Sequence, residues 1–437
     1  MPCPHCPHCQ KQEAEEAALR ELLAEQVVKE EPIDVDEVIE RPKQEEVLPL
    51  NDAQSPIALQ ITNNWKTQRL HLIEGIAGTG KTHLLNAIGS LIRNQGFHAV
   101  EVSLSQHASR SGKSIRSLIT SHEEDLLGID VILIDNVNQV SEDLIKELSE
   151  RLGRVMNTGK GVMFGGKGVV MVADFGLCLP YCNDWSKQKL SSLKFFTSVP
   201  QFKKHRLPTG DSPWLQMMEE IRKSPRVVLP EKKIVDDMDK LIDFTFGELY
   251  NEVPYENSVL LAPKKIDVDF LNQEVLKRIN GKIINLEAKF EGNVIRGDLD
   301  LHELRLKQDC ILMLDKNYEG IPNGTRLLFQ DNDRIHLNCK ILDGPRRGEQ
   351  VDIGRVEREQ GANPKESQQW VRQFPVTLAF AMTIYGSQGR RFERVGCYKL
   401  KENFEHGMVY TALSRSKDFR VLSSDNVIPN KLASMLV

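Results

Sequence analysis

Eight consecutive residues, Gly75 to Thr82, form the segment of this sequence best suited to chemistry. They read Gly-Ile-Ala-Gly-Thr-Gly-Lys-Thr, which fits the G-x-x-x-x-G-K-[ST] pattern of the phosphate-binding P-loop. Glycine lets backbone N–H groups turn inward and hold phosphate oxygens beside a helix N-terminus. In this pattern Lys81 reaches the β- and γ-phosphates of ATP, and the Thr82 hydroxyl ligates Mg²⁺. The predicted nucleotide contacts within the loop are Gly75, Ala77, Gly78, Thr79, Gly80, Lys81 and Thr82.

Two aspartates at the ends of apolar runs are further candidates. Residues 131–135 read VILID and residues 169–174 read VVMVAD, so Asp135 and Asp174 each end a β-type run. An aspartate that ends a strand beside a P-loop commonly holds Mg²⁺ through water. We assign this role to Asp135, next to Thr82. A surface aspartate that merely ends a strand is the alternative, and it is a stronger alternative for Asp174.

The P-loop needs a strand before it and a helix after it, and the sequence supplies both. The apolar run 70–74 precedes the loop, and residues 83–92 have the spacing of an amphipathic helix, which argues against a chance glycine-rich turn. Further strands are expected at 98–104, 130–135 and 168–174, with helical stretches between them. This alternation predicts a parallel sheet with its ligand at the carboxyl ends of the strands. Residues 49–190 should therefore form one α/β domain.

The rest of the chain indicates a second α/β domain with an insertion. Its expected elements are a helix at 214–222, a strand at 258–263, a helix from 268, a strand at 376–384 and a helix at 407–413. Residues 286–369 instead contain short β-type runs, such as 310–314 and 325–329, separated by Asn-Gly and Asp-Gly turns. We therefore predict a second domain made of 191–285 and 370–437, interrupted by a small antiparallel β-barrel.

The first 48 residues read as an acidic leader. Residues 11–48 hold thirteen acidic and five basic side chains, whereas the 437-residue chain has a net charge of only −5. Such a segment is expected to be disordered and dispensable for folding, although its Leu-containing part, 11–30, could bind a protein partner. Residues 28–31 also fit a short pattern for attachment of a ubiquitin-like modifier. The Cys and His residues of 3–9 fit either a disordered terminus or a zinc or intermolecular metal site.

Composition narrows the class of protein. A charged fraction of 27% and a hydrophobic fraction of 40% are ordinary for a globular protein. We find no apolar run long enough to span a bilayer and no signal-peptide pattern, so we expect an intracellular protein without a membrane partner. Because the leader is acidic, residues 49–437 are mildly basic, which permits a polyanionic partner.

Several motifs from residue 49 onward resemble the PIF-type, RecD-like DNA helicases of superfamily one, and most closely the branch carried by Helitron transposons. Residues 374–389, FPVTLAFAMTIYGSQG, look like motif V of that family, and residues 406–415, HGMVYTALSR, look like its motif VI. Residues 323–327 and 302–307 resemble its β-barrel segment, and residues 50–54, LNDAQ, resemble its Q motif.

The resemblance implies a fold, an activity and roles for individual residues. It implies two RecA-like domains with parallel sheets, ATP in the cleft between them, and single-stranded or forked DNA as partner, translocated 5′ to 3′. Gln54 would read the adenine edge, Arg415 would be the arginine finger, and Gln388 would lie near the phosphates. Arg206 is the candidate for the arginine of motif IV. The family also implies nuclear DNA repair or recombination, or a transposon-related role.

The chain departs from the family at polar positions of the active site. The family has Asp-Glu where this chain has Asp135-Asn136, and an amide cannot take a proton from the attacking water. Loss of a general base typically lowers the rate by ~10²–10⁴. The expected glutamine of motif III is Leu177, the lysine of motif V is Gly386, and the glutamine after Arg206 is Leu207. These departures leave three interpretations: a helicase, intact or impaired; a nucleotide-binding pseudoenzyme that binds DNA or a protein; or an unrelated P-loop enzyme such as a small-molecule kinase.

Overall fold

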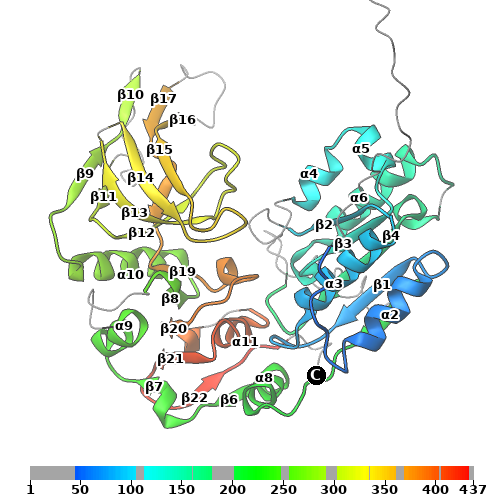
Figure 1. The fold of residues 1–437 in the computed structure, drawn as a ribbon. Helices are drawn as coiled ribbons and strands as arrows, with labels where there is room; N and C mark the ends of the chain where they lie inside the picture. The colour runs from blue at the N-terminus through cyan, green and yellow to red at the C-terminus, as the bar shows by residue number, and fades with distance from the viewer. Residues whose placement is uncertain are drawn as a thin grey trace, which may run out of the picture. The chain divides into compact units, whose positions relative to one another are not determined.

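The computed structural model describes nine ranges of the chain: 45–104, 113–159, 161–179, 201–247, 255–291, 303–333, 335–360, 369–402 and 405–432. The predicted leader and its Cys and His residues at 3–9 lie outside these ranges. Figure 1 shows the elements and their labels. Among the helices that the structure describes, none combines the length and apolar character needed to cross a bilayer.

The first sheet is parallel, with strand order β2-β3-β4-β1-β5. Its strands are β1 (Leu70–Glu74), β2 (Ala99–Val102), β3 (Val131–Ile134), β4 (Gly168–Ala173) and β5 (Lys203–Arg206). Its helices are α2 (Ser55–Asn64), α3 (Lys81–Asn94), α4 (Ile115–Ile119), α5 (Glu123–Leu127) and α6 (Glu142–Val155). The strands and the helix predicted around the P-loop are confirmed.

Alternation along the strands explains why helices cover both faces of this sheet. Ile132 and Ile134 of β3 pack in the cluster that contains α4, α5 and α6 residues, whereas Val131 and Leu133 pack with α2 and α3. A strand buried on both faces reads as a continuous apolar run, as β3 does. The edge strand β5 lacks that signal. Its sequence, KKHR, is half exposed, and it pairs in parallel with β1. The assignment of residues 203–206 to the second domain was therefore wrong.

The second sheet is also parallel, with strand order β19-β8-β20-β21-β7. Its strands are β7 (Ile234–Val235), β8 (Ser258–Ala262), β19 (Ala381–Thr383), β20 (Arg394–Cys397) and β21 (Asp418–Leu422). The helices of this region are α8 (Pro213–Lys223), α9 (Met238–Phe246), α10 (Lys265–Arg278) and α11 (Met408–Leu413). Beside them, β6 (Arg226–Val228) pairs antiparallel with β22 (Val427–Pro429).

The region between α10 and β19 is antiparallel β structure, as predicted, but its described strands form three sheets. Five strands have the order β15-β14-β13-β12-β18, three have the order β10-β17-β16, and β11 pairs with β9. Their bounds are β9 (Ile284–Glu287), β10 (Lys289–Glu291), β11 (Glu303–Leu306), β12 (Ile311–Leu314), β13 (Arg326–Asn332), β14 (His336–Ile341), β15 (Gln350–Gly354), β16 (Val356–Gln360), β17 (Gln369–Gln373) and β18 (Val376–Leu378). A closed barrel thus remains a prediction, and these strands extend beyond the predicted bounds of 286–369 at both ends.

One expected strand is divided between two sheets. The apolar run 376–384 forms β18, which pairs antiparallel with β12, and then β19, which pairs in parallel with β8. The break falls at Ala379 and Phe380, both fully buried. This run therefore joins the antiparallel region to the second parallel sheet.

Candidate nucleotide site

The P-loop connects β1 to α3 with the conformation that its glycines permit. Gly78 and Gly80 have φ values of 90° and 82°, in the left-handed region that favours glycine. The Lys81 ammonium lies against the loop and donates to the carbonyl oxygens of Gly75 (2.8 Å) and Ile76 (2.9 Å). The Trp214 side chain of α8 packs against the loop. It lies so close that a Cβ added at Gly78 would come within 2.4 Å of the ring.

Thr82 and Asp135 meet where a magnesium ion would be held. The Thr82 hydroxyl donates to Oδ2 of Asp135 at 2.8 Å, while Oδ1 of this buried carboxylate has no hydrogen-bond partner among the described residues. Burial raises the pKa of Asp135 to about 6. The hydrogen bond from Thr82 favours the ionised carboxylate and opposes part of this rise. A hydroxyl and a carboxylate with an unused oxygen are hard donors of the kind that Mg²⁺ prefers. The side chains present therefore fit this ion.

Asn136 follows Asp135 in a left-handed backbone conformation, with φ 54° and ψ 45°. Asparagine tolerates this conformation better than most residues with a Cβ. Asn136 leads directly into the 3₁₀ turn Val137–Gln139. Within this turn, Oδ1 of Asn138 accepts a hydrogen bond from the backbone amide of Asp174 at 3.3 Å.

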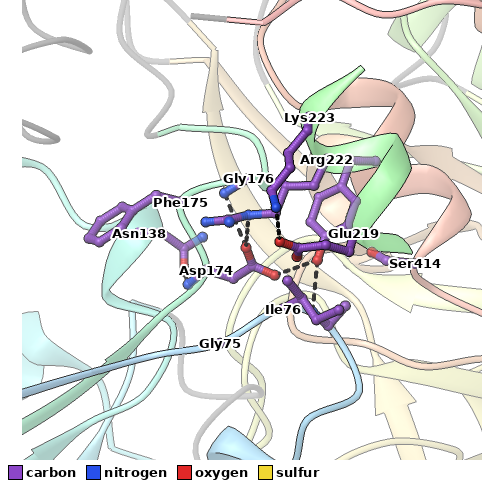
Figure 2. Close-up of polar contacts among 12 residues, drawn as sticks. Gly75, Ile76, Asn138, Asp174, Phe175, Gly176, Glu219, Arg222, Lys223 and Ser414 are labelled. Carbon is purple, nitrogen blue, oxygen red and sulfur yellow. Dashed lines mark hydrogen bonds and ion pairs between the residues drawn. The ribbon is translucent and has the colours of Figure 1, made fainter. Parts of the chain in front are cut away.

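Figure 2 shows the polar contacts around the Asp174 carboxylate. Oδ2 accepts from the Tyr410 hydroxyl at 2.7 Å and lies 3.9 Å from the Lys81 ammonium. Oδ1 accepts from the Gly176 amide at 3.1 Å and lies 3.5 Å from Nε of Arg222 on α8. The alternative reading of Asp174 as a surface residue is wrong, because the residue is 1% exposed.

The loop after β4 is held by residues that precede and form α11. His406 Nε2 donates to the Phe175 carbonyl at 3.0 Å, and the Cys178 amide donates to the Thr411 hydroxyl at 2.9 Å. A Cβ on Gly407 would come within 2.4 Å of the Gly176 carbonyl oxygen. Leu177, where the family has a glutamine, is buried in the apolar cluster of the second sheet. The second α/β region thus contacts the first through both backbone and apolar side chains.

Gln388 also makes a contact between the two α/β regions. Its Oε1 accepts from Nε2 of Gln139 at 3.1 Å, and Gln139 belongs to the turn just after Asp135 and Asn136. Nε2 of Gln388 is buried without a partner among the described residues. A buried amide N–H₂ with no acceptor is unfavourable, so an additional acceptor such as a phosphate oxygen or water would stabilise it.

Arg415 lies near the site but is engaged within its own region. Its buried guanidinium donates to the carbonyl oxygens of Thr411 (3.0 Å) and Arg390 (3.3 Å) and to the Ser414 hydroxyl (2.7 Å). Burial lowers the pKa of Arg415 to about 10. Arg206 ends β5 next to Glu74 of β1, with a largely exposed side chain 3.8 Å from Glu219 of α8.

Gln54 contacts the P-loop itself. Its Nε2 donates to the carbonyl oxygens of Thr79 (3.2 Å) and Gly80 (3.4 Å), and its Oε1 accepts from the Asn51 amide (3.2 Å). In this arrangement both ends of the amide are used by the protein, so reading an adenine edge would require the side chain to exchange partners.

Sequence reasoning missed three side chains that shape the site: Tyr410, Arg222 and Trp214. Tyr410 lay within the quoted motif VI but received no role, and Trp214 and Arg222 lay within a helix predicted only as a helix. The only sequence signal for these three residues was that they are aromatic or cationic side chains in an α/β chain that also carries the motifs. Their positions against the P-loop and Asp174 depend on contacts between segments more than 30 residues apart, which no local pattern gives.

Known proteins with similar sequences include a P-loop family and DNA helicases. A family model described as an AAA domain matches residues 49–166. The chain is 26% identical over 334 residues to the ATP-dependent DNA helicase Pif1 of Campylobacter jejuni, covering 68% of this chain and 70% of that protein. It is 24% identical over 354 residues to the ATP-dependent DNA helicase PIF1 of Emericella nidulans, covering 65% of this chain and 45% of that protein. The chain therefore spans less than half of this fungal relative.

Solved structures extend the comparison to most of the chain. Bacteroides Pif1 bound to single-stranded DNA is similar with a TM-score of 0.61 at 19% identity, covering 86% of this chain and 92% of that one. Bacteroides Pif1 with ADP-AlF3 and single-stranded DNA gives 0.61 at 20% identity, covering 86% and 93%. Pif1 helicase from Candida albicans gives 0.60 at 19% identity, covering 87% and 96%. The chain thus has the α/β fold of the Pif1 helicases, with parallel sheets as predicted.

Proposed function

We propose that this chain, which has the fold and motifs of a Pif1-type superfamily-one helicase, is an ATP-dependent DNA helicase. One observation carries the proposal: the P-loop is contacted by the motif VI helix of the second α/β region, where the Ala77 amide donates to the Tyr410 hydroxyl at 2.8 Å. A P-loop enzyme that acts through one domain, such as a small-molecule kinase, has no need of this contact. A motor that converts nucleotide binding into domain movement depends on one.

ATP and Mg²⁺ are the cofactors that the side chains fit. Lys81 would move from the P-loop carbonyls to the β- and γ-phosphates. The Ala77 amide could bind a phosphate oxygen once its hydrogen bond to the Tyr410 hydroxyl is broken. Thr82 and Asp135 would hold Mg²⁺, which neutralises charge on the phosphates. Gln388 would place its unpaired Nε2 toward the terminal phosphate. Arg206, exposed at the carboxyl end of β5, is a further candidate to approach it.

The finer assignments rest on the sequence motifs. We propose single-stranded or forked DNA as the partner, a closest relationship to the Helitron helicase branch, and Mg²⁺ as the metal. We also propose a nuclear location, a role in DNA repair, recombination or transposition, and a protein partner for the acidic leader. The two-domain division and its boundaries belong to the same proposal, with residues 203–206 moved to the first domain.

A nucleotide-binding pseudoenzyme is the second candidate, and Asn136 favours it. The residue is an amide at the position of the family's general base, in a left-handed conformation that suits asparagine. Such a protein would bind ATP and DNA but turn over slowly or not at all.

Two measurements on the full-length protein test these candidates. ATP hydrolysis is measured with and without single-stranded DNA, and DNA binding is measured across a salt series. The helicase predicts DNA-stimulated hydrolysis and unwinding of a forked duplex, whereas the pseudoenzyme predicts salt-dependent DNA binding without turnover. Absence of DNA binding at low salt would contradict both candidates and favour an unrelated P-loop enzyme.

A further inference from the structure

The loop of residues 387–392, here called the Arg390 loop, is connected to the antiparallel region by an ion pair. Only 8% of the Arg390 side chain is exposed, and its guanidinium pairs with the Asp343 carboxylate. Nη2 of the same guanidinium donates to the Gly324 carbonyl at 2.5 Å. Asp343 follows β14 and Gly324 precedes β13, so both acceptors belong to the antiparallel region. The Arg390 side chain therefore joins its own loop to that region.

These acceptors are themselves fixed within the antiparallel region. Oδ2 of Asp343 also accepts from the backbone amide of Arg326 at 3.2 Å, and the Gly324 amide donates to the Leu314 carbonyl of β12 at 2.7 Å. A second contact comes from Arg326, whose guanidinium lies 5.3 Å from the centroid of the Phe392 ring in the Arg390 loop. The antiparallel region thus contacts the loop at two points, through an ion pair and through a cation–π contact.

The backbone of the Arg390 loop in turn binds Arg415. Nη1 of Arg415 donates to the Arg390 carbonyl at 3.3 Å and makes a longer contact of 3.5 Å with the Ser387 carbonyl. The Phe392 amide donates to the Arg415 carbonyl at 3.0 Å. The side chain that resembles the arginine finger of the family therefore takes its position from this loop.

The loop also carries Gln388, which reaches the turn after Asp135. Oε1 of Gln388 accepts from Nε2 of Gln139 at 3.1 Å, whereas Nε2 of Gln388 is buried without a partner among the described residues. A buried amide N–H₂ without an acceptor is unfavourable, and a phosphate oxygen would satisfy it. One loop thus carries Gln388 and binds Arg415, and an ion pair with the antiparallel region fixes that loop.

We propose that the Asp343–Arg390 ion pair positions the Arg390 loop for recognition of the terminal phosphate, so that Gln388 and Arg415 favour ATP over ADP. Asp343 and Arg390 are positioning residues, which act through the loop and do not touch the nucleotide. The physical reason is preorganisation: a loop released from its ion pair samples positions in which the Gln388 amide no longer meets the phosphate. This inference rests on the proposed nucleotide site and deepens it.

The test compares five full-length variants with the wild type. Asp343→Asn removes the negative charge and keeps the shape of the side chain, Arg390→Gln removes the positive charge, and a double variant carries both changes. Arg390→Lys keeps the positive charge. The matched control is Arg346→Gln, which breaks an exposed ion pair with Glu349 in the same connection between β14 and β15. Calorimetry with Mg²⁺ measures the affinities for ATP and for ADP, and a thermal melt measures the stability of each variant.

We expect Asp343→Asn and Arg390→Gln each to weaken ATP binding by about tenfold, the typical effect of losing one hydrogen bond to a charged group, and to leave ADP binding unchanged. Because the two changes break one ion pair, the double variant should bind ATP no more weakly than either single variant. Arg390→Lys should recover part of the ATP affinity, and Arg346→Gln should match the wild type.

An unchanged ratio of ATP affinity to ADP affinity in the folded Asp343→Asn variant would overturn the inference, whether or not its melting temperature falls. The ion pair would then only stabilise the fold. Additive losses in the double variant would also overturn it, because the two residues would act separately. A wild type that binds neither nucleotide would refute the proposed nucleotide site itself, and the inference with it.

Discussion

The hydroxyl of Tyr410 donates a 2.7 Å hydrogen bond to Asp174 and accepts one of 2.8 Å from the amide of Ala77. One oxygen atom thus joins a helix of the second α/β region to the P-loop and to the carboxylate that follows β4. Burial raises the pKa of Tyr410 well above its usual value, so the group stays a neutral hydroxyl at physiological pH. A phosphate that takes the Ala77 amide must displace Tyr410, which links nucleotide binding to this contact.

Tyr410→Phe should therefore cost more stability without nucleotide than with it. Removing the hydroxyl leaves the Ala77 amide without its partner, at a cost of about 1–3 kcal/mol. Saturating ATP would supply a phosphate oxygen and recover part of that loss, so the ATP-induced rise in melting temperature should be larger than in the wild type. The matched control is Tyr385→Phe, which removes a hydroxyl bonded to the Leu179 carbonyl and leaves the Ala77 amide with its Tyr410 partner. An equal ATP-induced shift in all three proteins would contradict the coupling.

Lys81→Ala should abolish Mg²⁺-dependent ATP binding. Its ammonium is the only side-chain cation that the described P-loop itself contributes, and it already lies within hydrogen-bonding distance of the loop carbonyls. Differential scanning fluorimetry with and without millimolar ATP is the measurement, since a ligand that binds the native state raises its melting temperature. Lys240→Ala on α9, an exposed lysine paired with Asp236, is the control. A wild type that shows no shift would refute the nucleotide site.

Asn136→Glu should raise DNA-stimulated ATP hydrolysis by the ~10²–10⁴ attributed to a general base, if the rest of the site is sound. The same substitution should lower stability by about 1 kcal/mol, because glutamate is less tolerant of the left-handed backbone at this residue. Asn136→Gln is the control, since it carries the same backbone strain without a carboxylate.

The outcome of that experiment separates the two candidate functions. If hydrolysis stays flat in Asn136→Glu while ATP still binds, the buried Leu177 and the Gly386 position have uncoupled the site more deeply, and the pseudoenzyme is favoured. If the wild type already hydrolyses ATP rapidly and the variant adds nothing, another carboxylate supplies the base. Glu142 and Asp143, in the first turn of α6, are the nearest in sequence.

Stability should fall between about pH 6.5 and pH 4 because of a buried histidine pair in the first sheet. His71 Nδ1 lies 3.0 Å from His205 Nε2, and burial lowers the pKa of His71 to about 4 and also lowers that of His205. The unfolded chain takes up protons below about pH 6.5 while the folded pair does not, so the stability present above that pH is lost as the pH falls. The loss from His71 is at most about 3 kcal/mol.

Urea denaturation at pH 7 and at pH 5 measures this effect. Replacing both His71 and His205 by Gln should flatten the pH dependence, whereas His122→Gln, at an exposed histidine, should leave it unchanged. A steep slope that persists in the double variant would assign the acid sensitivity to other groups.

Local patterns predicted the first domain well because its signals are local. The P-loop, the helix after it and the four buried strands each follow from the types of adjacent residues. Strand β5 escaped prediction because its charged sequence becomes a strand only through pairing with β1, where Lys203 lies opposite His71. The run 376–384 was read as one strand because its apolar composition does not reveal that different partners lie on either side of Ala379 and Phe380.

The candidate site divides in the same way. The proximity of Thr82 and Asp135 could be predicted because a P-loop and a strand end meet at the same edge of a parallel sheet, and a hydrogen bond joins the two side chains. Their roles toward a nucleotide stay predictions. The contacts of Tyr410 with Ala77 and Asp174 depend on how two α/β regions meet, and the hydrogen bonds of Arg415 depend on tertiary contacts within the second region. The contact between the two regions is set by tertiary packing, such as the burial of Leu177 among residues of the second region.

The residues that connect β18 to β19 are held by hydrogen bonds on all sides. Asn272 of α10 donates to the Leu378 carbonyl at 3.1 Å and accepts from the Ala381 amide at 2.9 Å, while Ala379 and Phe380 are hydrogen-bonded to β12 and β8 respectively. Inserting or deleting a single residue here would turn inward-facing side chains outward in one sheet or the other. The length of this junction is therefore as constrained as its composition. Grafting the antiparallel region onto another scaffold would have to preserve Ala379, Phe380 and the bridging Asn272.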